Sequence, residues 1–182
     1  MSIANSLVEN AWYAAGLSGD FAPGKVHGRV IASKPMVLWR NQDDRISVFD
    51  DRCIHKRMPL SAGRIMDDGC LECVYHGLRY DADGICVAIP SQPDGPIPAR
   101  ARLRPYPLCE QQGLVWVWPG DEGRIGNCRP PATPEIDDAD WDTCPSDRLP
   151  VSANYRLLIE NLLDITHFYP LHDGNIGDLS NS

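Results

Sequence analysis

Short apolar runs separated by turn residues fill the chain from Trp12 to Trp118. Three pairs of these runs flank a recognisable turn, at Asn41 to Asp44, at Ala82 to Gly84 and at Gln111 to Gly113. Each pair predicts a β-hairpin, because two strand-like segments joined by a few turn residues fold back on each other. The pattern predicts one antiparallel, mainly β domain over residues 10–118.

The composition changes after this region. Residues 119–150 are rich in Pro, Asp, Gly and Arg and show no periodicity, which predicts a connector. Beyond it, the run NYRLLIENLLDITHFYPLH predicts a helix from about Asn154 to Tyr169, stopped by Pro170. Apolar residues surround most of the circumference of this helix, so it is expected to need a core on several sides. Residues 151–182 are therefore predicted to begin a second domain.

Charge and composition argue against several kinds of partner. The sequence has 17 Lys and Arg against 25 Asp and Glu, and the net charge of −8 does not suit a nucleic-acid or anionic-membrane partner. It has no apolar run long enough to span a bilayer and no basic leader, so we expect a cytoplasmic protein. Seven cysteines at irregular spacing are typical of metal ligands in a reducing compartment. Five of them are expected to be core or surface thiols: Cys70, Cys86, Cys109, Cys128 and Cys144.

Two pairs of metal-binding residues stand out within the β region. Cys53-x-His55 and Cys73-x-x-His76 are separated by 17 residues. Four such ligands can close a tetrahedral zinc site, or the thiolates can hold one iron of a 2Fe-2S cluster and the imidazoles the other. Zinc fingers usually pair Cys with Cys and His with His, whereas each pair here supplies one of each, so the order favours the cluster. Each pair is expected to lie on a tight loop whose turns are supplied by Pro59, Gly63 and Gly77.

A second candidate site lies in the run ENLLDITHFYPLH. Asn161, Asp164 and His167 are three residues apart and so lie along one face of the predicted helix. His172 follows five residues after His167, and Pro170 is expected to break the helix and let the second imidazole turn back toward the first. Two converging imidazoles are two thirds of a facial triad for mononuclear iron(II), whose other positions bind dioxygen and substrate.

The segments NAWYAAG, CIHKRMPLSAG, CVYHGLRYD and GLVWVWPGD resemble the Rieske non-haem iron oxygenases, in particular the vanillate O-demethylase and dicamba monooxygenase group. The resemblance covers nearly the whole chain. Rieske proteins of respiratory and photosynthetic cytochrome complexes carry two further cysteines that bridge the ligand loops, and this sequence has Met58 and Tyr75 at those positions. The resemblance therefore implies the lower-potential oxygenase or ferredoxin type of cluster.

The run N-x-x-D-x-x-H-x-x-x-x-H resembles the catalytic-domain motif of the same family. The resemblance implies a ring of three subunits, in which Asp164 connects His76 of one subunit to His167 of the next. A purely structural role for Asp164, holding His167 in place, is compatible with the same residues. The family's third iron ligand is an aspartate far downstream, and the last two carboxylates, Asp173 and Asp178, do not match its position. We therefore expect the sequence to be part of a longer oxygenase.

The resemblance implies an all-β Rieske domain followed by the first helix of an α+β, helix-grip catalytic domain. It implies an oxygenase component with a 2Fe-2S cluster and mononuclear Fe(II), which receives NAD(P)H-derived electrons from a reductase or ferredoxin. Dioxygen would be used to hydroxylate or O-demethylate an aromatic substrate. Two other functions stay open at this point: a Rieske ferredoxin that only carries electrons, and a structural zinc module.

Overall fold

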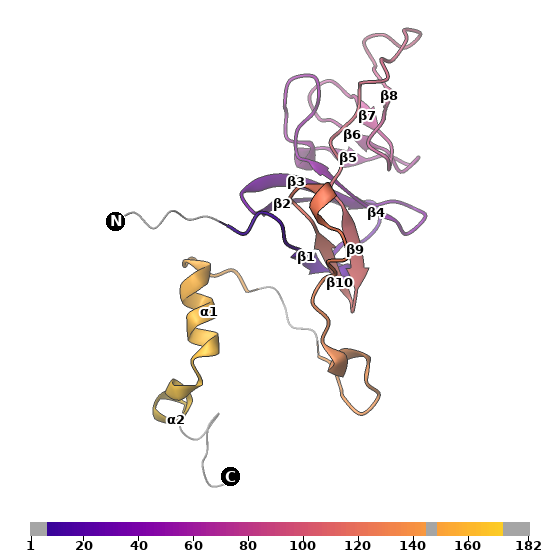
Figure 1. Cartoon of the computed structure of the whole chain (residues 1–182). Helices are drawn as coiled ribbons and strands as arrows, with labels where there is room; N and C mark the ends of the chain where they lie inside the picture. Colours follow the sequence, from indigo (N-terminus) through magenta and orange to yellow (C-terminus); the bar gives the residue numbers. More distant parts are fainter. Residues whose placement is uncertain (1–6, 145–148, 173–182) are drawn as a thin grey trace, which may run out of the picture. The chain divides into compact units, whose positions relative to one another are not determined.

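The computed structural model describes residues 7–144 and 149–172. The chain divides into two compact units, Met1–Thr143 and Cys144–Ser182, of which the first is mainly β and the second helical (Figure 1). The boundary falls inside the connector predicted over residues 119–150. Within the described residues, no helix is long and apolar enough to cross a membrane.

Among the described residues, ten strands form three antiparallel sheets. The first sheet contains, in spatial order, β1 (Tyr13–Leu17), β10 (Leu114–Val117) and β9 (Leu108–Gln111). The second contains β2 (Val26–Ile31), β3 (Lys34–Arg40) and β4 (Ile46–Asp50). The third contains β5 (Arg64–Ile65), β6 (Leu71–Glu72), β7 (Arg79–Tyr80) and β8 (Cys86–Ala88). The prediction of an antiparallel, mainly β domain is confirmed.

The three predicted hairpins are all present, as β3–β4, β7–β8 and β9–β10. The last one turns at Gln112 and Gly113, whose φ values of 53° and 73° fit the type I′ turn that matches the twist of paired strands. A further hairpin, β2–β3, turns at Ala32 and Ser33, with φ values of 48° and 63°. The sequence does not predict this turn, because neither residue is one of those that favour left-handed backbone.

The β unit contains two hydrophobic cores. The first, here called the loop core, consists of Val37, Trp39, Phe49, Cys53, Leu60, Leu71, Cys73, Leu78, Tyr80, Cys86, Ala101 and Leu103. The second, here called the strand core, consists of Ala15, Phe21, Ile31, Met36, Leu38, Ile46, Val48, Tyr106, Val115 and Val117. Figure 1 shows the sheet β2-β3-β4 between the other two sheets, which explains why a core lies on each side of it.

Strand β3 is buried on both faces because it lies between these two cores. Its side chains alternate, with Val37 and Trp39 in the loop core and Met36 and Leu38 in the strand core. A strand buried on both faces reads as a continuous apolar run rather than as an alternation. The run PMVLW in the sequence therefore reflects the central position of β3.

A buried arginine joins the end of β3 to β9. Arg40 is 6% exposed, and its guanidinium donates to Oε1 of Glu110 at 2.7 Å and to Oγ of Ser18 at 2.9 Å. Its Nε donates to the carbonyl of Phe21 at 3.0 Å. The hydrogen bond from Arg40 lowers the pKa of Glu110. A buried guanidinium with this many acceptors fixes the relative positions of the segments that supply them.

The second unit corrects the predicted helix boundaries. Helix α1 (Tyr155–Leu163) begins after Asn154, whose side chain accepts from the backbone of the first turn, and it ends at Asp164 rather than at Pro170. Asp164 takes an extended conformation and caps the next 3₁₀ turn instead of continuing the helix. Pro170 lies in the short helix α2 (Phe168–Leu171), in a first turn where proline breaks no intrahelical hydrogen bond.

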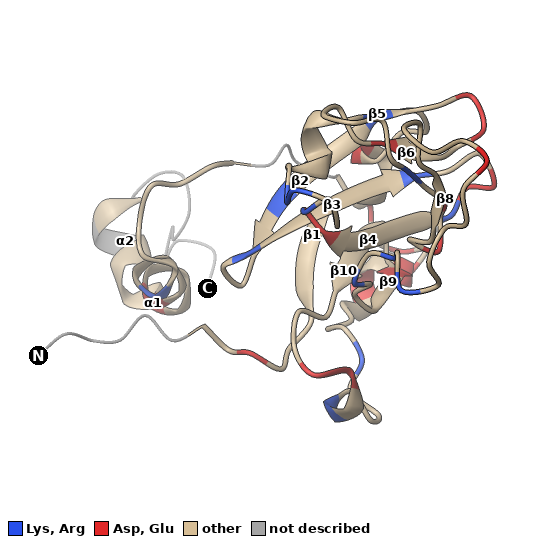
Figure 2. Cartoon of the chain, turned by 90° about the horizontal axis from the view of Figure 1, so that it is seen from above, with Lys and Arg blue, Asp and Glu red and all other residues tan. Residues whose placement is uncertain are grey.

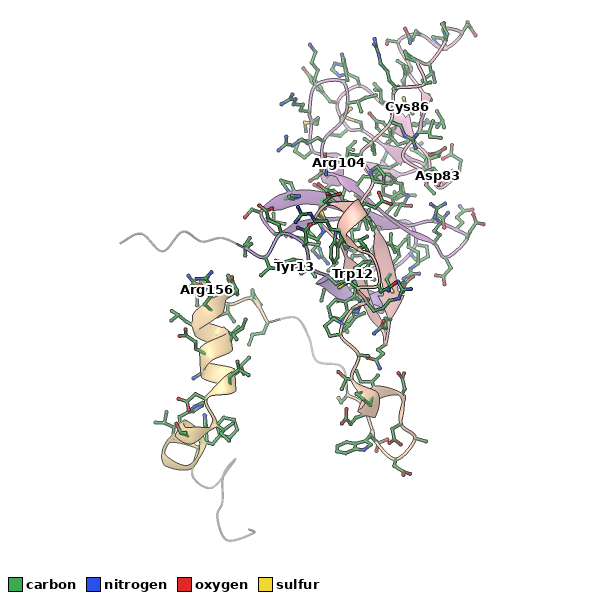
Figure 3. All side chains as sticks on the ribbon, in the orientation of Figure 1. Trp12, Tyr13, Asp83, Cys86, Arg104 and Arg156 are labelled. Carbon is green, nitrogen blue, oxygen red and sulfur yellow. The ribbon has the colours of Figure 1, made fainter. Side chains whose placement is uncertain are left out.

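Helix α1 exposes apolar side chains around its circumference. Side chains project from all sides of it in Figure 3, where Arg156 is labelled near its N-terminal end. The exposed apolar residues are Leu157, Leu158, Ile159, Leu162 and Leu163. This arrangement agrees with the apolar circumference read from the sequence.

Candidate metal centre

The two predicted ligand pairs lie on two loops with the same backbone hydrogen bonds, here called the first ligand loop (residues 53–58) and the second ligand loop (residues 73–78). In each loop, the N–H of the cysteine donates to the carbonyl five residues later, at 2.9 Å in both. The N–H four residues after each cysteine donates back to the cysteine carbonyl, at 2.9 Å and 3.0 Å. The cysteines therefore occupy equivalent positions, whereas His55 and His76 occupy the third and fourth positions of their loops.

Both ligand loops need a left-handed residue at their fifth position. In the second loop this residue is Gly77, with a φ of 70°, as expected for a turn glycine. In the first loop it is Arg57, with a φ of 56°. A side chain in this conformation costs roughly 1–2 kcal/mol relative to glycine. The first ligand loop therefore has Arg57 at the position that corresponds to Gly77 in the second ligand loop.

A second glycine lets the segment after the first ligand loop pass close to the residue that precedes the second. A Cβ on Gly63 would lie 2.2 Å from the carbonyl oxygen of Glu72 and 2.9 Å from that of Leu60. Gly63 closes a turn, as predicted, because its N–H donates to the carbonyl of Leu60 at 2.8 Å, but its φ of −80° is one that any residue can adopt. Gly63 is required because backbone passes within contact distance of it.

An ion triad holds the short strands beside the second ligand loop. Glu72 accepts from Arg64 at 2.6 Å and from Arg79 at 2.9 Å, and these two hydrogen bonds, Arg79 first, lower the pKa of Glu72. Glu72 precedes Cys73, and Arg79 precedes Tyr80 in the neighbouring strand. The triad therefore fixes the backbone on which a candidate ligand and a buried tyrosine are placed.

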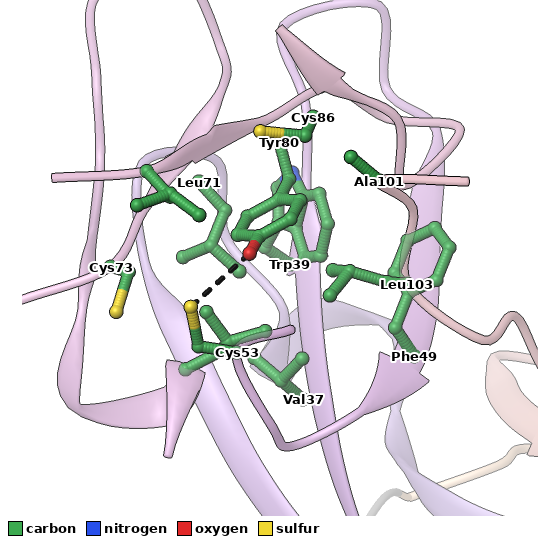
Figure 4. Close-up of a cluster of buried hydrophobic side chains, with 12 residues drawn as sticks. Val37, Trp39, Phe49, Cys53, Leu71, Cys73, Tyr80, Cys86, Ala101 and Leu103 are labelled. Carbon is green, nitrogen blue, oxygen red and sulfur yellow. Dashed lines mark hydrogen bonds between the residues drawn. The ribbon is translucent and has the colours of Figure 1, made fainter. Parts of the chain in front are cut away.

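The four candidate ligands are sorted by type in space. Cys53 and Cys73 are 2% and 1% exposed, and Figure 4 shows their sulfur atoms next to each other inside the loop core. His55 and His76 are exposed, and their Nδ1 atoms face each other at 3.1 Å. Burial raises the pKa of the Cys73 thiol, and the neighbouring Cys53 thiol raises it further. Metal binding at the thiols would therefore release protons.

Tyr80 supports the sulfur side of this arrangement. Its hydroxyl lies 3.2 Å from Sγ of Cys53, drawn as the dashed line in Figure 4, and also accepts from the backbone N–H of Ile54 at 3.4 Å. Burial raises the pKa of Tyr80 well above its ordinary value. The phenol therefore stays protonated and can donate to a thiolate at Cys53.

These side chains fit a 2Fe-2S cluster better than a single ion. Within residues 7–144 and 149–172, no three His, Cys, Asp or Glu side chains gather around one point closely enough to hold a metal ion. A single zinc ion needs three or four protein donors, whereas each iron of a 2Fe-2S cluster needs only two. A buried thiol pair and a separate imidazole pair match that requirement.

The second predicted motif is only partly held together by the structure. The rings of His167 and His172 have centroids 5.5 Å apart and are inclined by 63°, so the two imidazoles lie side by side. Because α1 ends at Asp164, Asn161 and His167 do not share one continuous helical face, contrary to the prediction. Oδ1 of Asp164 accepts from both the N–H and the hydroxyl of Thr166, and these hydrogen bonds lower the pKa of Asp164. Asp173 and Asp178 lie outside the described residues.

The remaining cysteines are core or surface thiols, as predicted. Cys86 is buried, Cys70 and Cys109 are half-buried, and Cys128 and Cys144 are exposed. Burial raises the pKa of Cys70 to about 11, which keeps that thiol protonated at neutral pH. None of these five residues lies on either ligand loop.

Comparison with known families settles the nature of the β unit. Residues 11–107 match the Rieske [2Fe-2S] domain. The chain belongs to the Rieske domain family. Residues 117–181 match a second family, described as the 3-ketosteroid 9alpha-hydroxylase C-terminal domain. The cofactor of a Rieske domain is a 2Fe-2S cluster, and the donor set of the two ligand loops fits it.

Rieske proteins of known name resemble both units of the chain. Dicamba O-demethylase, oxygenase component, from Stenotrophomonas maltophilia is 37% identical over 173 residues, which are 93% of this chain and 49% of that protein. Toluene-4-sulfonate monooxygenase system iron-sulfur subunit TsaM1 from Comamonas testosteroni is 34% identical over 176 residues, 93% of this chain and 48% of that protein. The chain spans about half the length of these relatives.

The fold agrees with a solved Rieske oxygenase. A crystal structure of dicamba monooxygenase bound to dicamba aligns with a TM-score of 0.82 and 35% sequence identity, covering 92% of this chain and 49% of that one. The expected resemblance to the dicamba and vanillate demethylase group is therefore confirmed. A vanillate O-demethylase oxygenase subunit from a Pseudomonas strain is 33% identical over 169 residues.

Sequence patterns did not reveal all the residues that shape the centre. Tyr80 is predicted only as a strand residue, because alternation indicates burial but not which atom the hydroxyl meets. Arg57 gives no signal in the sequence, because arginine is not a residue type that favours a left-handed backbone. Aligning the two ligand loops on their cysteines pairs Arg57 with Gly77 and so could have drawn attention to Arg57, but it gives no signal for Tyr80.

Proposed function

We propose that this chain is the Rieske domain and the beginning of the catalytic domain of a terminal oxygenase component. In this proposal the whole protein uses dioxygen and NAD(P)H-derived electrons, delivered by a reductase or ferredoxin, to hydroxylate or O-demethylate an aromatic substrate. The names of the relatives that match both units support it, since they include the oxygenase component of dicamba O-demethylase and an iron-sulfur subunit of a toluene-4-sulfonate monooxygenase system. A cytoplasmic location belongs to the same proposal.

We assign the ligands of the cluster to the two ligand loops. Cys53 and Cys73 would hold one iron inside the loop core, and His55 and His76 would hold the other at the surface. The buried thiols are kept from water by the surrounding apolar side chains, and the Tyr80 hydroxyl would donate to the iron-bound sulfur of Cys53. The exposed imidazoles then form the surface at which a partner makes contact. When bound, the cluster supplies storage of one electron at a time.

We assign His167 and His172 to the mononuclear iron(II), which when bound supplies the activation of dioxygen. Their rings lie side by side, so one ion could be shared between them. A facial triad needs a carboxylate as its third ligand, and in this proposal that ligand comes from outside the described residues. Asn161 lies one helical turn before Asp164 and would help to orient this segment.

We further propose that the working enzyme is a trimer in which Asp164 connects two subunits. Asp164 is exposed, and of the described residues only Thr166 bonds its carboxylate, both times at Oδ1. The second oxygen could therefore accept from His76 of a neighbouring subunit. In this arrangement the carboxylate of Asp164 would accept a hydrogen bond from His76 of the neighbouring subunit. It would also hold the segment that contains His167 in its own subunit.

The observation that carries the proposal is the pairing of two buried thiols with two facing imidazoles on equivalent loops. It is tested by iron and sulfide analysis of the purified chain, with EPR spectroscopy after dithionite reduction. We expect about two irons and two sulfides per Rieske domain and a rhombic signal. Cys73→Ser should abolish both, whereas Cys86→Ser, which places the same hydroxyl in the same core, should retain them. Stoichiometric zinc without an EPR signal would refute the assignment.

The alternative function, a Rieske ferredoxin, accounts for the ligand loops but not for the second unit. The match of residues 117–181 to a hydroxylase C-terminal domain favours the oxygenase. Reductase-dependent consumption of dioxygen by the full-length protein, coupled to loss of an aromatic substrate, distinguishes the two. A ferredoxin would transfer electrons without consuming substrate.

A further inference from the structure

The connector that follows β10 is tied to the β unit by side chains of that unit. The indole N–H of Trp12 donates to the carbonyl of Cys128 at 3.2 Å. The side chain of Gln111, the last residue of β9, donates to the carbonyl of Pro131 at 3.1 Å. The first part of the connector therefore follows the surface of the domain instead of forming a loose linker.

The neighbouring residue, Gln112, holds the connector with three hydrogen bonds. Its Oε1 accepts from the N–H of Thr133 at 2.9 Å, and its Nε2 donates to the carbonyl of Thr133 at 2.8 Å. The same Nε2 donates to Oδ2 of Asp137 at 2.6 Å. Thr133 and Asp137 are the two ends of a 3₁₀ turn, since Thr133 caps Pro134–Asp137. This arrangement of Gln112, Thr133 and Asp137 is here called the connector clamp.

Beyond the connector clamp, residues 138–143 are tied only to nearby residues of the connector. The N–H groups of Asp140 and Trp141 both donate to Asp138, to its side chain and to its carbonyl respectively. In the structure described for residues 138–143, no hydrogen bond or ion pair reaches a strand of the β unit. Trp141 is 61% exposed, although a packed segment would bury it. The clamp is therefore the last tie to the β unit in the described residues up to Thr143.

Gln112 is an unusual residue for the position that it occupies. It is the first left-handed residue of the β9–β10 turn, with a φ of 53°, and Gly113 is the second. Type I′ turns favour Asn, Asp or Gly at this position, and glutamine is not among them. Gln112 is also half-buried, although it lies at the tip of a hairpin. A disfavoured backbone that persists at a surface turn points to a function for the side chain.

A neutral amide suits the turn that the clamp holds. The turn is acidic, because it contains Glu135 and Asp137, and Figure 2 shows acidic residues in red close to β9. The amide of Gln112 donates to the carboxylate of Asp137 without adding a charge, and a hydrogen bond to a charged acceptor is stronger than one between neutral groups. A glutamate at position 112 would repel the same carboxylate.

We propose that Gln112 is a positioning residue, which clamps the connector to the β unit and so fixes the point from which the chain continues toward the catalytic domain. The clamp concerns the described residues alone, whereas its effect on the catalytic domain rests on the proposed function. Without the clamp, the last tie would be the one at Pro131, so that residues 132–137 would be released. Six residues add roughly 20 Å of extended chain. A longer tether spreads the catalytic domain over more positions and lowers the fraction of time spent in the productive one.

Proteolysis of the full chain tests the clamp itself. Endoproteinase Glu-C cleaves after Glu135, inside the clamped turn, and its rate follows how often that turn opens. Gln112→Gly suits the left-handed turn but removes the clamp. We therefore expect cleavage after Glu135 to become about three- to tenfold faster while the melting temperature of the β unit does not fall. Mass spectrometry identifies the site, and cleavage after Glu160 in α1 is the internal reference.

Two further variants separate the amide from the turn. Gln112→Asn keeps an amide and suits a left-handed backbone, but its side chain is too short to bond both Thr133 and Asp137, so it should behave like Gln112→Gly. Ser33→Gly relieves an exposed left-handed residue of φ 63° in the β2–β3 turn and should be cleaved at the wild-type rate. Cleavage after Glu135 at the wild-type rate in both Gln112 variants would overturn the clamp.

The positioning role is tested in the full-length oxygenase. The cluster is reduced with dithionite, freed of excess reductant and mixed with dioxygen and the aromatic substrate of the oxygen-consumption assay. We expect the cluster of Gln112→Gly to be reoxidised about three- to tenfold more slowly than that of wild type or Ser33→Gly. Its EPR spectrum and reduction potential should be unchanged, which distinguishes positioning from damage to the cluster.

The outcomes separate this inference from the proposed function. Reoxidation at the wild-type rate in Gln112→Gly would overturn the positioning role, even where proteolysis shows that the connector is released. Absence of the cluster in wild type would refute the proposed function and the positioning role with it. The clamp would then still be decided by the cleavage after Glu135, which requires no cluster.

Discussion

The hydroxyl of Tyr80 lies 3.2 Å from Sγ of Cys53, on the buried side of the first ligand loop. A hydrogen bond to a cluster sulfur stabilises the reduced, more negative state over the oxidised one. We therefore predict that Tyr80→Phe lowers the reduction potential, by on the order of 50 mV for a one-electron couple. Protein-film voltammetry would measure the potential.

Tyr106 offers a matched control for this prediction. It is a buried tyrosine in the strand core, its hydroxyl donates to Asp50, and it has no place on a ligand loop. Tyr106→Phe should lower thermal stability but leave the potential unchanged. Equal shifts of potential in both variants would show that the effect arises from general loosening of the domain rather than from the bond to sulfur.

Gly63→Ala should push apart the two segments that carry the ligand loops. The added methyl would lie 2.2 Å from the carbonyl oxygen of Glu72, and main chain on both sides leaves little room to relax. We expect iron and sulfide content to fall severalfold and the melting temperature to drop, as overpacking typically costs about 1–3 kcal/mol. Gly19→Ala is the control, because a Cβ there meets no atom within 4 Å, and it should retain a full cluster.

The ion pair of Arg40 and Glu110 should give the β unit a defined pH dependence. The pKa of Glu110 is lowered in the folded protein, so its pairing stabilises the fold above the unfolded pKa of about 4.3 and is lost as pH falls through the folded pKa. Glu110→Gln should therefore lower the free energy of unfolding by about 1 kcal/mol at pH 7. This value is small because Glu110 is partly exposed and water screens its charge. Urea titrations at pH 7 and pH 3.5 would measure both proteins, and the gap between them should narrow at the lower pH. A gap independent of pH would contradict the role of the carboxylate charge.

Asp164→Asn should separate the electrostatic role of this residue from its structural one. Asparagine caps a helical turn as well as aspartate does, so the hydrogen bonds with Thr166 can be kept while the charge is lost. In the assembled oxygenase we expect both iron sites to stay loaded while reoxidation of the cluster during a single turnover slows by at least tenfold. Thr166→Val, which disturbs the cap but keeps the charge, should react at close to the wild-type rate. Wild-type turnover in Asp164→Asn would leave the residue with a structural role only.

Local patterns predicted those parts of the fold that are determined locally. The β9–β10 hairpin follows from Gly113 in its turn, whereas the β2–β3 hairpin has Ala32 and Ser33 in the same left-handed conformations and gives no such signal. The sequence predicts the end of α1 too late, because Asp164 can either continue a helix or cap the next turn, and sequence does not show which bond its carboxylate makes.

Predictions for the site divide in the same way. Spacing and order bring out Cys53, His55, Cys73 and His76, because ligand loops constrain residues close together in the chain. The close approach at Gly63 and the hydroxyl of Tyr80 depend on contacts between segments nine to 27 residues apart, which periodicity cannot reveal. The two ligand loops share the same backbone hydrogen bonds, and this comparison shows that Arg57 occupies the position of Gly77.

Strand β3 gives side chains alternately to the loop core and to the strand core. Loosening of one core therefore removes packing partners from the other, and the two cannot melt independently. The β unit should therefore unfold in one cooperative transition. Loss of the cluster should lower the hydrogen-exchange protection of backbone amides even in β1 and β10. The state of the metal centre would then be coupled to the rigidity of the segment through which the chain leaves the domain.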